Sequence, residues 1–249
     1  MSEQEILFEK RGKIHFITFN RPKRKNAIPA AAYERIENIL KQANDDPDTV
    51  FTVFTGNGDF FSSGNDFGPE SFSPSEKSYE TMITSLIDHK KILIALVNGP
   101  AIGVACTMLT LFDYVVASEK AYFFCPFTLY GLLPEGTSSH NFEAIMGYPR
   151  AARLALFADR ITAKEAFEAS FVTKVLPDSE FATETKKILQ HFETQLAPQS
   201  ILLSKELMRG PEWRKKMHKI NMEERDKIQE RLGSDETIER IVSRFGPKL

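Results

Sequence analysis

Glu135 is the residue whose type and surroundings most clearly predict chemistry. It is the only formally charged residue between Lys120 and Glu143, and it lies in the apolar, aromatic stretch "LLPEGTSSHNF". Burying a carboxylate costs several kcal/mol unless it is paired or neutralised, and a desolvated carboxylate gains a raised pKa that suits a base. Two structural alternatives stay open here. The side chain points into solvent, or it caps a helix that begins at Thr137 or Ser138.

Two glycine-containing segments supply hydrogen-bond donors that suit an anion. In "FFSSGNDF", Gly64 permits a backbone shape that turns the amide N–H of Asn65 outward. In "VNGPAIGVACTM", a strand gives way to a helix near Gly103 and Val104, where the first N–H groups lack helical partners. Each segment alone is also typical of an ordinary turn or strand–helix connection that binds nothing. Together they predict a two-donor oxyanion hole.

The elements that must position these residues alternate between strands and helices. Residues 4–19 have the pattern of a β-hairpin, and residues 30–43 carry apolar side chains at helical spacing. Short apolar runs predict buried strands at 49–56, 92–99, 114–118 and 121–127, with helices over 77–91 and 103–113. The chain is therefore expected to have an α/β architecture with buried sheets.

The pattern becomes helical from Pro149 onward. Thr162 and Glu165 have the spacing of a capping box, and the last part of the chain predicts charged helices around Trp213. No flexible linker, low-complexity segment or repeat indicates a second domain. We therefore expect residues 1–195 to form the core and residues 196–249 to form a C-terminal helical region of the same structural unit.

Composition gives no reason to expect a nucleic acid, a metal or a membrane span. The formal net charge is −2, and Cys106 and Cys125 have neither zinc-site spacing nor the number of a disulfide framework. The histidines form no metal-ligand spacing with other ligand residues, and no apolar run approaches the ~20 residues of a membrane helix. The charged N-terminus also argues against a secretory signal.

Five segments, taken in order, resemble the crotonase, or enoyl-CoA hydratase/isomerase, superfamily across nearly the whole chain. They are "NRPKRKNAI", "FFSSGNDF", "VNGPAIGVACTMLTLFDYVVAS", "LLPEG" and "ADRITAKEAFEASFVTKVLP". The resemblance implies a crotonase-like spiral of ββα units with a helical C-terminal region that forms homotrimers, with stacked hexamers as the alternative. It also implies that the backbone N–H groups of Asn65 and Val104 bind the thioester oxygen of an acyl-CoA substrate.

The catalytic residues of this superfamily vary, so the residues of this chain decide the branch. Family hydratases carry glutamates at the positions matched here by Thr107 and Phe127, and both are absent. Glu135 matches the catalytic base of the delta3-delta2-enoyl-CoA isomerases, and "SSGND", "NGPAIG" and "LPEGTSS" are most similar to the peroxisomal monofunctional members. The resemblance implies conversion of cis- or trans-3-enoyl-CoA to trans-2-enoyl-CoA in beta-oxidation, without a metal or redox cofactor. The alternatives are another acyl-CoA enzyme of this fold, such as a hydratase or thioesterase, and a catalytically silent member that binds CoA or RNA.

Other residues are expected to bind the substrate around this centre. The basic cluster suits the CoA phosphates, although a solvated positive loop explains it equally well. Asn26 and Ala27 are expected to contact the adenine end through their backbones, and Asp66 to shape its loop through side-chain bonds to the backbone. The candidate substrate-binding residues are Lys23, Arg24, Lys25, Asn26, Ala27, Ser62, Ser63, Gly64, Asp66 and Phe127. Phe127 is also a candidate wall residue around Glu135, with Phe123, Leu132 and Leu133.

The last three residues resemble a targeting signal. Pro247, Lys248 and Leu249 differ from the peroxisomal Ser-Lys-Leu signal only at the first position. For an isomerase of unsaturated fatty-acid oxidation, this predicts a peroxisomal location and a peroxisomal import receptor as partner. A cytoplasmic or mitochondrial location is the alternative.

Overall fold

The computed structural model describes residues 2–66 and 79–245, so the expected signal at residues 247–249 lies outside the described residues. The strands are β1 Ile6–Arg11, β2 Ile14–Phe19, β3 Phe51–Gly56, β4 Ile92–Val97, β5 Ala101–Ile102, β6 Tyr114–Ser118, β7 Tyr122–Phe124, β8 Ile161–Thr162 and β9 Lys174–Leu176. The α-helices are α1 Ser2–Glu5, α2 Ala30–Asp45, α3 Tyr79–Ile87, α4 Val104–Thr107, α5 Ser138–Met146, α6 Tyr148–Ala155, α7 Ala163–Glu168, α8 Phe181–Gln195, α9 Pro198–Met208, α10 Pro211–Leu232 and α11 Asp235–Phe245. Short 3-10 helices are η1 Pro22–Arg24, η3 Met108–Leu111, η4 Thr128–Tyr130 and η5 Asp178–Glu180. The expected α/β architecture is confirmed.

The main sheet has six strands in the order β1-β2-β3-β4-β6-β9. β1 and β2 are antiparallel, with Ile6 opposite Phe19, which confirms the hairpin expected over residues 4–19. The remaining neighbours are parallel. Because parallel strands end at the same edge of a sheet, the loops that follow β2, β3 and β4 leave the sheet side by side.

A smaller sheet of β5, β7 and β8 follows the end of β4. β5 pairs in parallel with β7, with Ala101 opposite Phe123. The sequence did not indicate β5, because two residues are too few for a periodic pattern. The helix expected over 103–113 is present as α4 followed by the tighter turn η3. The capping box expected at Thr162 and Glu165 is confirmed at the start of α7.

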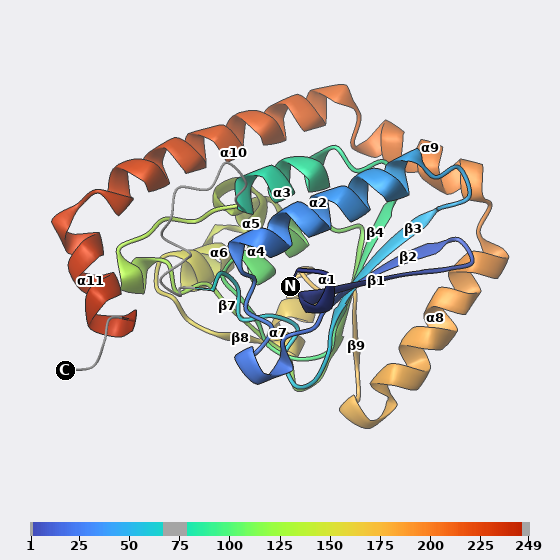
Figure 1. Ribbon diagram of the computed structural model, residues 1–249, viewed down its shortest axis with the longest axis horizontal. Coiled ribbons are helices and arrows are strands. Elements are labelled where there is room, and N and C mark those ends of the chain that lie inside the picture. Colours follow the sequence, from blue (N-terminus) through green and yellow to red (C-terminus); the bar gives the residue numbers. More distant parts are fainter. Residues whose placement is uncertain (1, 67–78, 246–249) are drawn as a thin grey trace.

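Apolar side chains cover both faces of the main sheet. One core cluster joins the sheet to α2, α3 and α4, and it includes Ile36, Phe54 and Val104. The other cluster lies beneath α8 and α9, where Phe51 stacks on Phe192 with ring centroids 6.2 Å apart. Figure 1 shows α2 and α3 on one side of the sheet and α8 on the other. Burial on both faces explains why the strand sequences are almost continuously apolar.

The C-terminal helices are attached to the core by buried or half-buried polar contacts. On α9, Lys205 Nζ donates to the carbonyl of Lys91 at 2.6 Å and to Asp113 Oδ2 at 2.7 Å. On α10, Arg225 Nη1 lies 2.9 Å from Glu80 Oε1 of α3. Figure 1 shows α10 running along the outer side of α3. Side chains on the inner face of α10 can therefore reach the part of the core that lies beneath α3.

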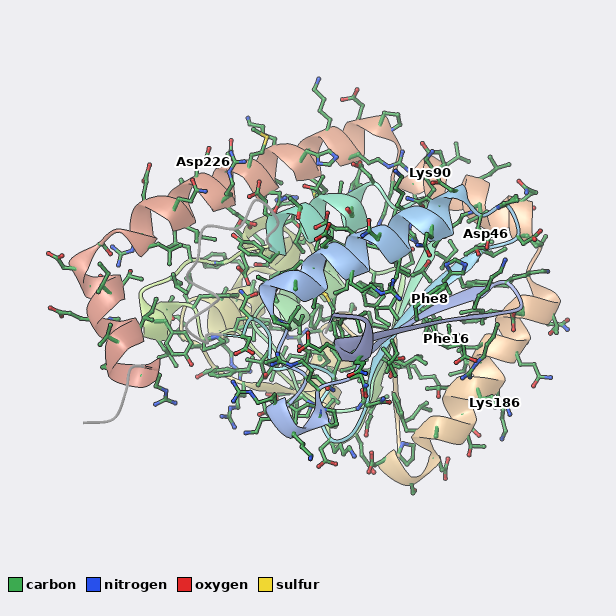
Figure 2. The ribbon with its side chains drawn as sticks, in the orientation of Figure 1. Phe8, Phe16, Asp46, Lys90, Lys186 and Asp226 are labelled. Atoms are coloured by element: carbon green, nitrogen blue, oxygen red, sulfur yellow. The ribbon has the colours of Figure 1, made fainter. Side chains whose placement is uncertain are left out.

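Asp46 ties the end of α2 to the hairpin. Its Oδ2 lies 3.1 Å from His15 Nε2 of β2 and 2.6 Å from Lys10 Nζ of β1. Phe8 packs edge-on against His15 with ring centroids 5.0 Å apart, and Figure 2 shows Phe8 and Asp46 in this part of the molecule. The bond from Lys10 holds the pKa of Asp46 well below its usual range, whereas burial lowers the pKa of His15. These contacts fix the far end of α2.

Asn26 joins the loop after β2 to the loop after β3. Its side chain is buried, and its Oδ1 accepts the N–H of Arg21 at 2.8 Å. Its Nδ2 donates to the carbonyls of Asn57 at 2.9 Å and Phe60 at 2.7 Å. One side chain therefore satisfies three backbone groups on two loops.

Replacing Asn26 with alanine should lower the free energy of unfolding by about 3 kcal/mol, because three backbone groups each lose a hydrogen bond. Urea denaturation measures this loss. Asn57→Ala is the matched control: it removes an exposed amide and should cost less than about 0.5 kcal/mol. Equal losses in the two variants would contradict the role given to Asn26.

Candidate active site

The loops after β3 and β4 are joined side by side. Ser62 N–H donates to the carbonyl of Pro100 at 3.2 Å, and Ile102 N–H donates to the carbonyl of Ser62 at 3.0 Å. Gly64 follows with a φ of 83°, and a Cβ at this position would lie 2.5 Å from the carbonyl oxygen of Ile102. A side chain cannot fit there, so glycine is needed both for its φ and for the close approach. The peptide of Asn65 is thereby brought beside the start of α4.

The backbone N–H groups of Asn65 and Val104 lie on these adjoining loops. The carbonyl of Gly64 accepts the N–H of Ile28 at 2.8 Å, and the carbonyl of Gly103 accepts two N–H groups of α4 at 2.8 and 3.0 Å. Within residues 2–66 and 79–245, neither the Asn65 nor the Val104 N–H donates to a protein acceptor. Both peptide groups are held through their carbonyls while their N–H groups remain unused, as an oxyanion hole requires.

Glu135 is buried, with 5% of its surface exposed. Its Oε1 has no hydrogen-bond partner among the described residues. Burial is the main cause that raises the pKa of Glu135 to about 8, and the negative charge of Glu224 adds to the rise. The solvent-exposed alternative for Glu135 is therefore wrong, and the apolar environment expected from the sequence is present.

The turn that carries Glu135 packs against the same short helix that presents Val104. Gly136 has a φ of 68°, and a Cβ there would lie 3.0 Å from Thr107 Oγ1 and 3.1 Å from Ile83 Cδ1. Thr107 ends α4, and its Oγ1 donates to the carbonyl of Val104 at 3.3 Å. The base candidate and one oxyanion donor are thus linked through a single helical turn.

Two tyrosines surround this centre, and the sequence did not single them out. Tyr33 of α2 donates its hydroxyl hydrogen bond to Asn65 Oδ1. Burial, followed by the charge of Glu135, raises the pKa values of Tyr33 and Tyr79. Both phenols therefore stay protonated. The close approach of Gly64 to Gly103 and of Gly136 to Thr107 places the Asn65 loop and the Glu135 turn against the two ends of α4.

Helix α5 is capped by Glu224, a residue that the sequence reasoning missed. The carboxylate accepts the N–H of Thr137 at 2.6 Å and the N–H of Ser139 at 2.8 Å, whereas the Thr137 side chain makes no cap bond. The cap alternative for Glu135 is therefore also wrong. A signal was available, because Met217, Asn221, Glu224 and Ile228 recur at helical spacing and form the buried face of α10.

The three expected cations lie together on an exposed turn around η1. Lys23, Arg24 and Lys25 are all exposed, Arg24 Nη2 lies 3.6 Å from Asp66 Oδ1, and Lys25 Nζ lies 5.3 Å from the centre of the Phe60 ring. The weak pairing leaves the cations accessible from solvent. Their role in binding phosphates stays a prediction.

The neighbouring candidate residues mainly build the loops. The backbone N–H groups of Asn26 and Ala27 donate within the η1 turn, and their carbonyls accept from Ser62 and Arg21, so each carbonyl keeps one further acceptor site. Ser62 is buried, and its Oγ also accepts the N–H of Gly64 at 3.1 Å. Their contacts with a substrate remain predictions.

Ser63 and Asp66 are half-buried on the same loop. Ser63 N–H donates to the carbonyl of Lys25 at 2.9 Å, and Asp66 Oδ2 accepts from Arg21 Nη1 at 2.8 Å. Arg21 also donates to a backbone carbonyl of the η1 turn. Asp66 thus shapes the loop through a guanidinium that binds the backbone, in addition to its own backbone N–H bond to Ile28 at 3.0 Å.

Phe127 lies in the apolar wall beneath the site. Its side chain is buried in the same core cluster as Phe123 and Val104, and Leu132 packs against that cluster. The carbonyl of Phe127 accepts the N–H of Leu132 at 2.8 Å, which turns the chain toward Glu135. An aromatic side chain thus stands where a hydratase glutamate is expected.

A surface hollow of about 690 Å³ lies elsewhere, between Asp88 and the outer side of α10. It is lined mainly by charged side chains, including Arg214, Lys215 and Lys219. It contains none of the groups described above. The buried turn at Glu135 and this hollow are therefore separate features of the molecule.

A family comparison agrees with this geometry. Residues 9–248 match the family described as enoyl-CoA hydratase/isomerase. This chain belongs to the enoyl-CoA hydratase/isomerase family. A solved enoyl-CoA hydratase/isomerase from Pseudoalteromonas atlantica T6c is 32% identical with a TM-score of 0.90, covering 97% of this chain and 96% of that one. The crotonase-like fold implied by the sequence motifs is confirmed.

The curated relatives of this chain include proteins named as enoyl-CoA delta isomerases. Enoyl-CoA delta isomerase 2 of Rattus norvegicus is 42% identical over 96% of this chain, and the chain spans 62% of that protein's length. Peroxisomal enoyl-CoA delta isomerase 3 of Mus musculus is 40% identical over 94% of this chain and 75% of that protein. Among the described residues of this family member, no helix is both long and apolar enough to cross a membrane.

The stability of the protein should depend on pH through Glu135. Its pKa is raised from 4.5 to about 8 in the folded state, so the folded protein binds more protons than the unfolded chain between these values, and stability falls as pH rises through that window. Glu135→Gln lacks this titration. It should exceed the wild type in free energy of unfolding by a few kcal/mol near about pH 9, with the gap closing toward about pH 4. Denaturant titrations at both pH values measure this; a gap that does not change with pH would contradict the burial of an ionisable base.

Proposed function

We propose that the chain is a delta3-delta2-enoyl-CoA isomerase that converts cis- or trans-3-enoyl-CoA to trans-2-enoyl-CoA in the beta-oxidation of unsaturated fatty acids. One observation carries the proposal: a buried carboxylate with a raised pKa, Glu135, lies on a turn packed against α4, and the N–H groups of Asn65 and Val104 at the start of α4 have no acceptor among the described residues. Thr107 and Phe127 replace the two glutamates expected of a hydratase. The names of the curated relatives support the same reaction.

The proposed reaction moves one proton between two carbons. Glu135 removes a proton from C2, and the electron pair shifts toward the thioester oxygen to form a dienolate. The N–H groups of Asn65 and Val104 stabilise this oxyanion, each by roughly 3 kcal/mol. Protonated Glu135 then returns the proton to C4, so the carboxylate is regenerated and the substrate gains and loses no atoms.

The pKa of Glu135 suits both halves of this cycle. A base with a pKa of about 8 is partly ionised at neutral pH, and it holds a carbon-derived proton more readily than an ordinary glutamate does. The tyrosine hydroxyls stay protonated and do not compete as bases. The reaction is redox-neutral and its charge forms next to two N–H donors, so we propose that it uses no metal or redox cofactor; coenzyme A is part of the substrate.

The remaining substrate contacts follow from the position of the loops. We propose that Lys23, Arg24 and Lys25 bind the CoA phosphates and that the backbones of Asn26 and Ala27 meet the adenine end, with the loop residues Ser62, Ser63, Gly64 and Asp66 shaping the channel. The exposure of the three cations on one turn supports this. Phe127 would pack against the acyl chain near Glu135.

We further propose that residues 196–249 belong to the same structural unit as residues 1–195 and mediate a homotrimer, with a hexamer as the alternative. The bond between Lys205 and Asp113 supports a single unit. Exposed apolar side chains on α9 support subunit packing, with Leu207 at 88% and Met208 at 80% exposed.

Glu135→Gln should lower the isomerase activity on 3-enoyl-CoA by about a thousandfold, because the amide cannot accept the proton. An ultraviolet or coupled assay of cis- and trans-3-enoyl-CoA measures it. Glu143→Gln is the matched control, since Glu143 is exposed on α5 and should retain full activity. Near wild-type turnover by Glu135→Gln would refute the assignment. Water addition to 2-enoyl-CoA, thioester hydrolysis, or RNA binding without turnover would point instead to another member of the family.

We also propose a peroxisomal location, in which an import receptor recognises Pro247, Lys248 and Leu249. The mouse relative is named as peroxisomal, which supports this. A chain tagged at its N-terminus should overlap a peroxisomal marker in cells, and deletion of Leu249 should leave it in the cytosol. Unchanged peroxisomal import after the deletion would exclude the tripeptide as the signal.

A further inference from the structure

The carboxylate of Glu224 occupies the N-terminal end of α5, directly after the turn that carries Glu135. Its Oε2 accepts the N–H of Thr137 at 2.6 Å, and its Oε1 accepts the N–H of Ser139 at 2.8 Å. Thr137 has a φ of 65°, a conformation that is unfavourable for a residue with a side chain. Both carboxylate oxygens are therefore used to hold a strained segment immediately next to Glu135.

Helix α10, which packs along α3, holds Glu224 in place. Met217, Asn221 and Ile228 are buried on the same face of this helix, and Glu224 itself is 6% exposed. Asn221 Nδ2 lies 3.4 Å from the carbonyl of Glu80, at the start of α3. Figure 2 shows Asp226 on the outer side of α10. An acidic side chain on this helix is therefore buried or exposed according to the face of the helix on which it lies.

We propose that Glu224 is a positioning residue for Glu135: it fixes the backbone that carries the base, and its charge acts on the base across the site. This inference rests on the proposed function, in which Glu135 is the proton carrier. Glu224 touches no reacting atom and so is not itself a catalytic residue. Its role makes the active site depend on a helix of the C-terminal region.

Glu224 is a nearby acid, and its negative charge can oppose the ionisation of Glu135. The charged and titratable groups around the two acids are Tyr33, Tyr79, Glu80, Cys125 and Arg225. Burial raises the pKa values of Tyr33, Tyr79 and Cys125, so these three stay neutral. Arg225 is paired with Glu80 and Asp226. Burial raises the pKa of Glu224, and the hydrogen bonds from Ser139 and Thr137 oppose this rise.

Glu224→Gln separates the charge from the shape. The amide fills the same space and keeps one acceptor, but it carries no charge. Glu135 should then ionise at lower pH, because a like charge no longer opposes it. The acidic limb of kcat/KM, which reports the free enzyme, should move down by about one pH unit. A purely structural cap would not move this limb.

Glu224→Asp tests the opposite combination. It keeps the charge but is one methylene shorter, so it should leave the acidic limb near the wild-type position and lower kcat about tenfold, with little change in KM. Glu223→Gln is the matched control, because Glu223 is the adjacent acid and its side chain is 60% exposed. This control should keep the wild-type limb and kcat. If Glu224→Gln fails to fold, the aspartate variant alone carries the test.

The outcomes separate this inference from the proposed function. A downward limb shift in Glu224→Gln together with a reduced kcat in Glu224→Asp supports it. Wild-type limb and kcat in the folded Glu224 variants overturn it, even when Glu135→Gln is inactive. If Glu135→Gln is fully active, the proposed function itself has failed. The pH dependence of kcat/KM in the Glu224 variants then no longer reports the ionisation of Glu135.

Discussion

The desolvated carboxylate of Glu135 is the constraint on which the rest of the site depends. Burial raises its pKa to about 8, and its Oε1 has no partner among the described residues. Such a group is costly, so the surrounding fold has to hold it against solvation. Gly136 permits the close packing of the turn on α4, and Glu224 holds the backbone that follows. The same lack of solvation leaves the carboxylate basic enough to accept a proton from carbon.

The oxyanion donors depend on a different constraint, the close approach of two loops at one edge of the sheet. The parallel strands deliver both loops to that edge, and the missing side chain of Gly64 lets the loop meet the carbonyl of Ile102. In the proposed function, a fold of this kind keeps its two donors and changes the chemistry through the position of the carboxylate, with Glu135 alone in place of the hydratase pair.

The sequence predicted features that depend on near neighbours. The hairpin, the capping box at Thr162 and the burial of Glu135 each follow from residues close together in the chain. It did not reveal contacts made by tertiary packing. Tyr33 meets Asn65 only because α2 packs over one face of the sheet, and Glu224 caps α5 from 87 residues beyond Thr137. The spacing of residues indicated the buried face of α10. It did not indicate that this face would contact the start of α5, because a local pattern does not specify which helices pack together.

The most direct test of the proposed proton transfer is to measure the pKa of Glu135 in the free protein. Infrared difference spectra of wild type minus Glu135→Gln, recorded across a pH titration, isolate the carboxyl stretch of this one residue. A desolvated Glu135 should titrate with a midpoint at a pH of about 8. A midpoint near 4.5, the ordinary value, would contradict a desolvated base and with it the proposed proton transfer.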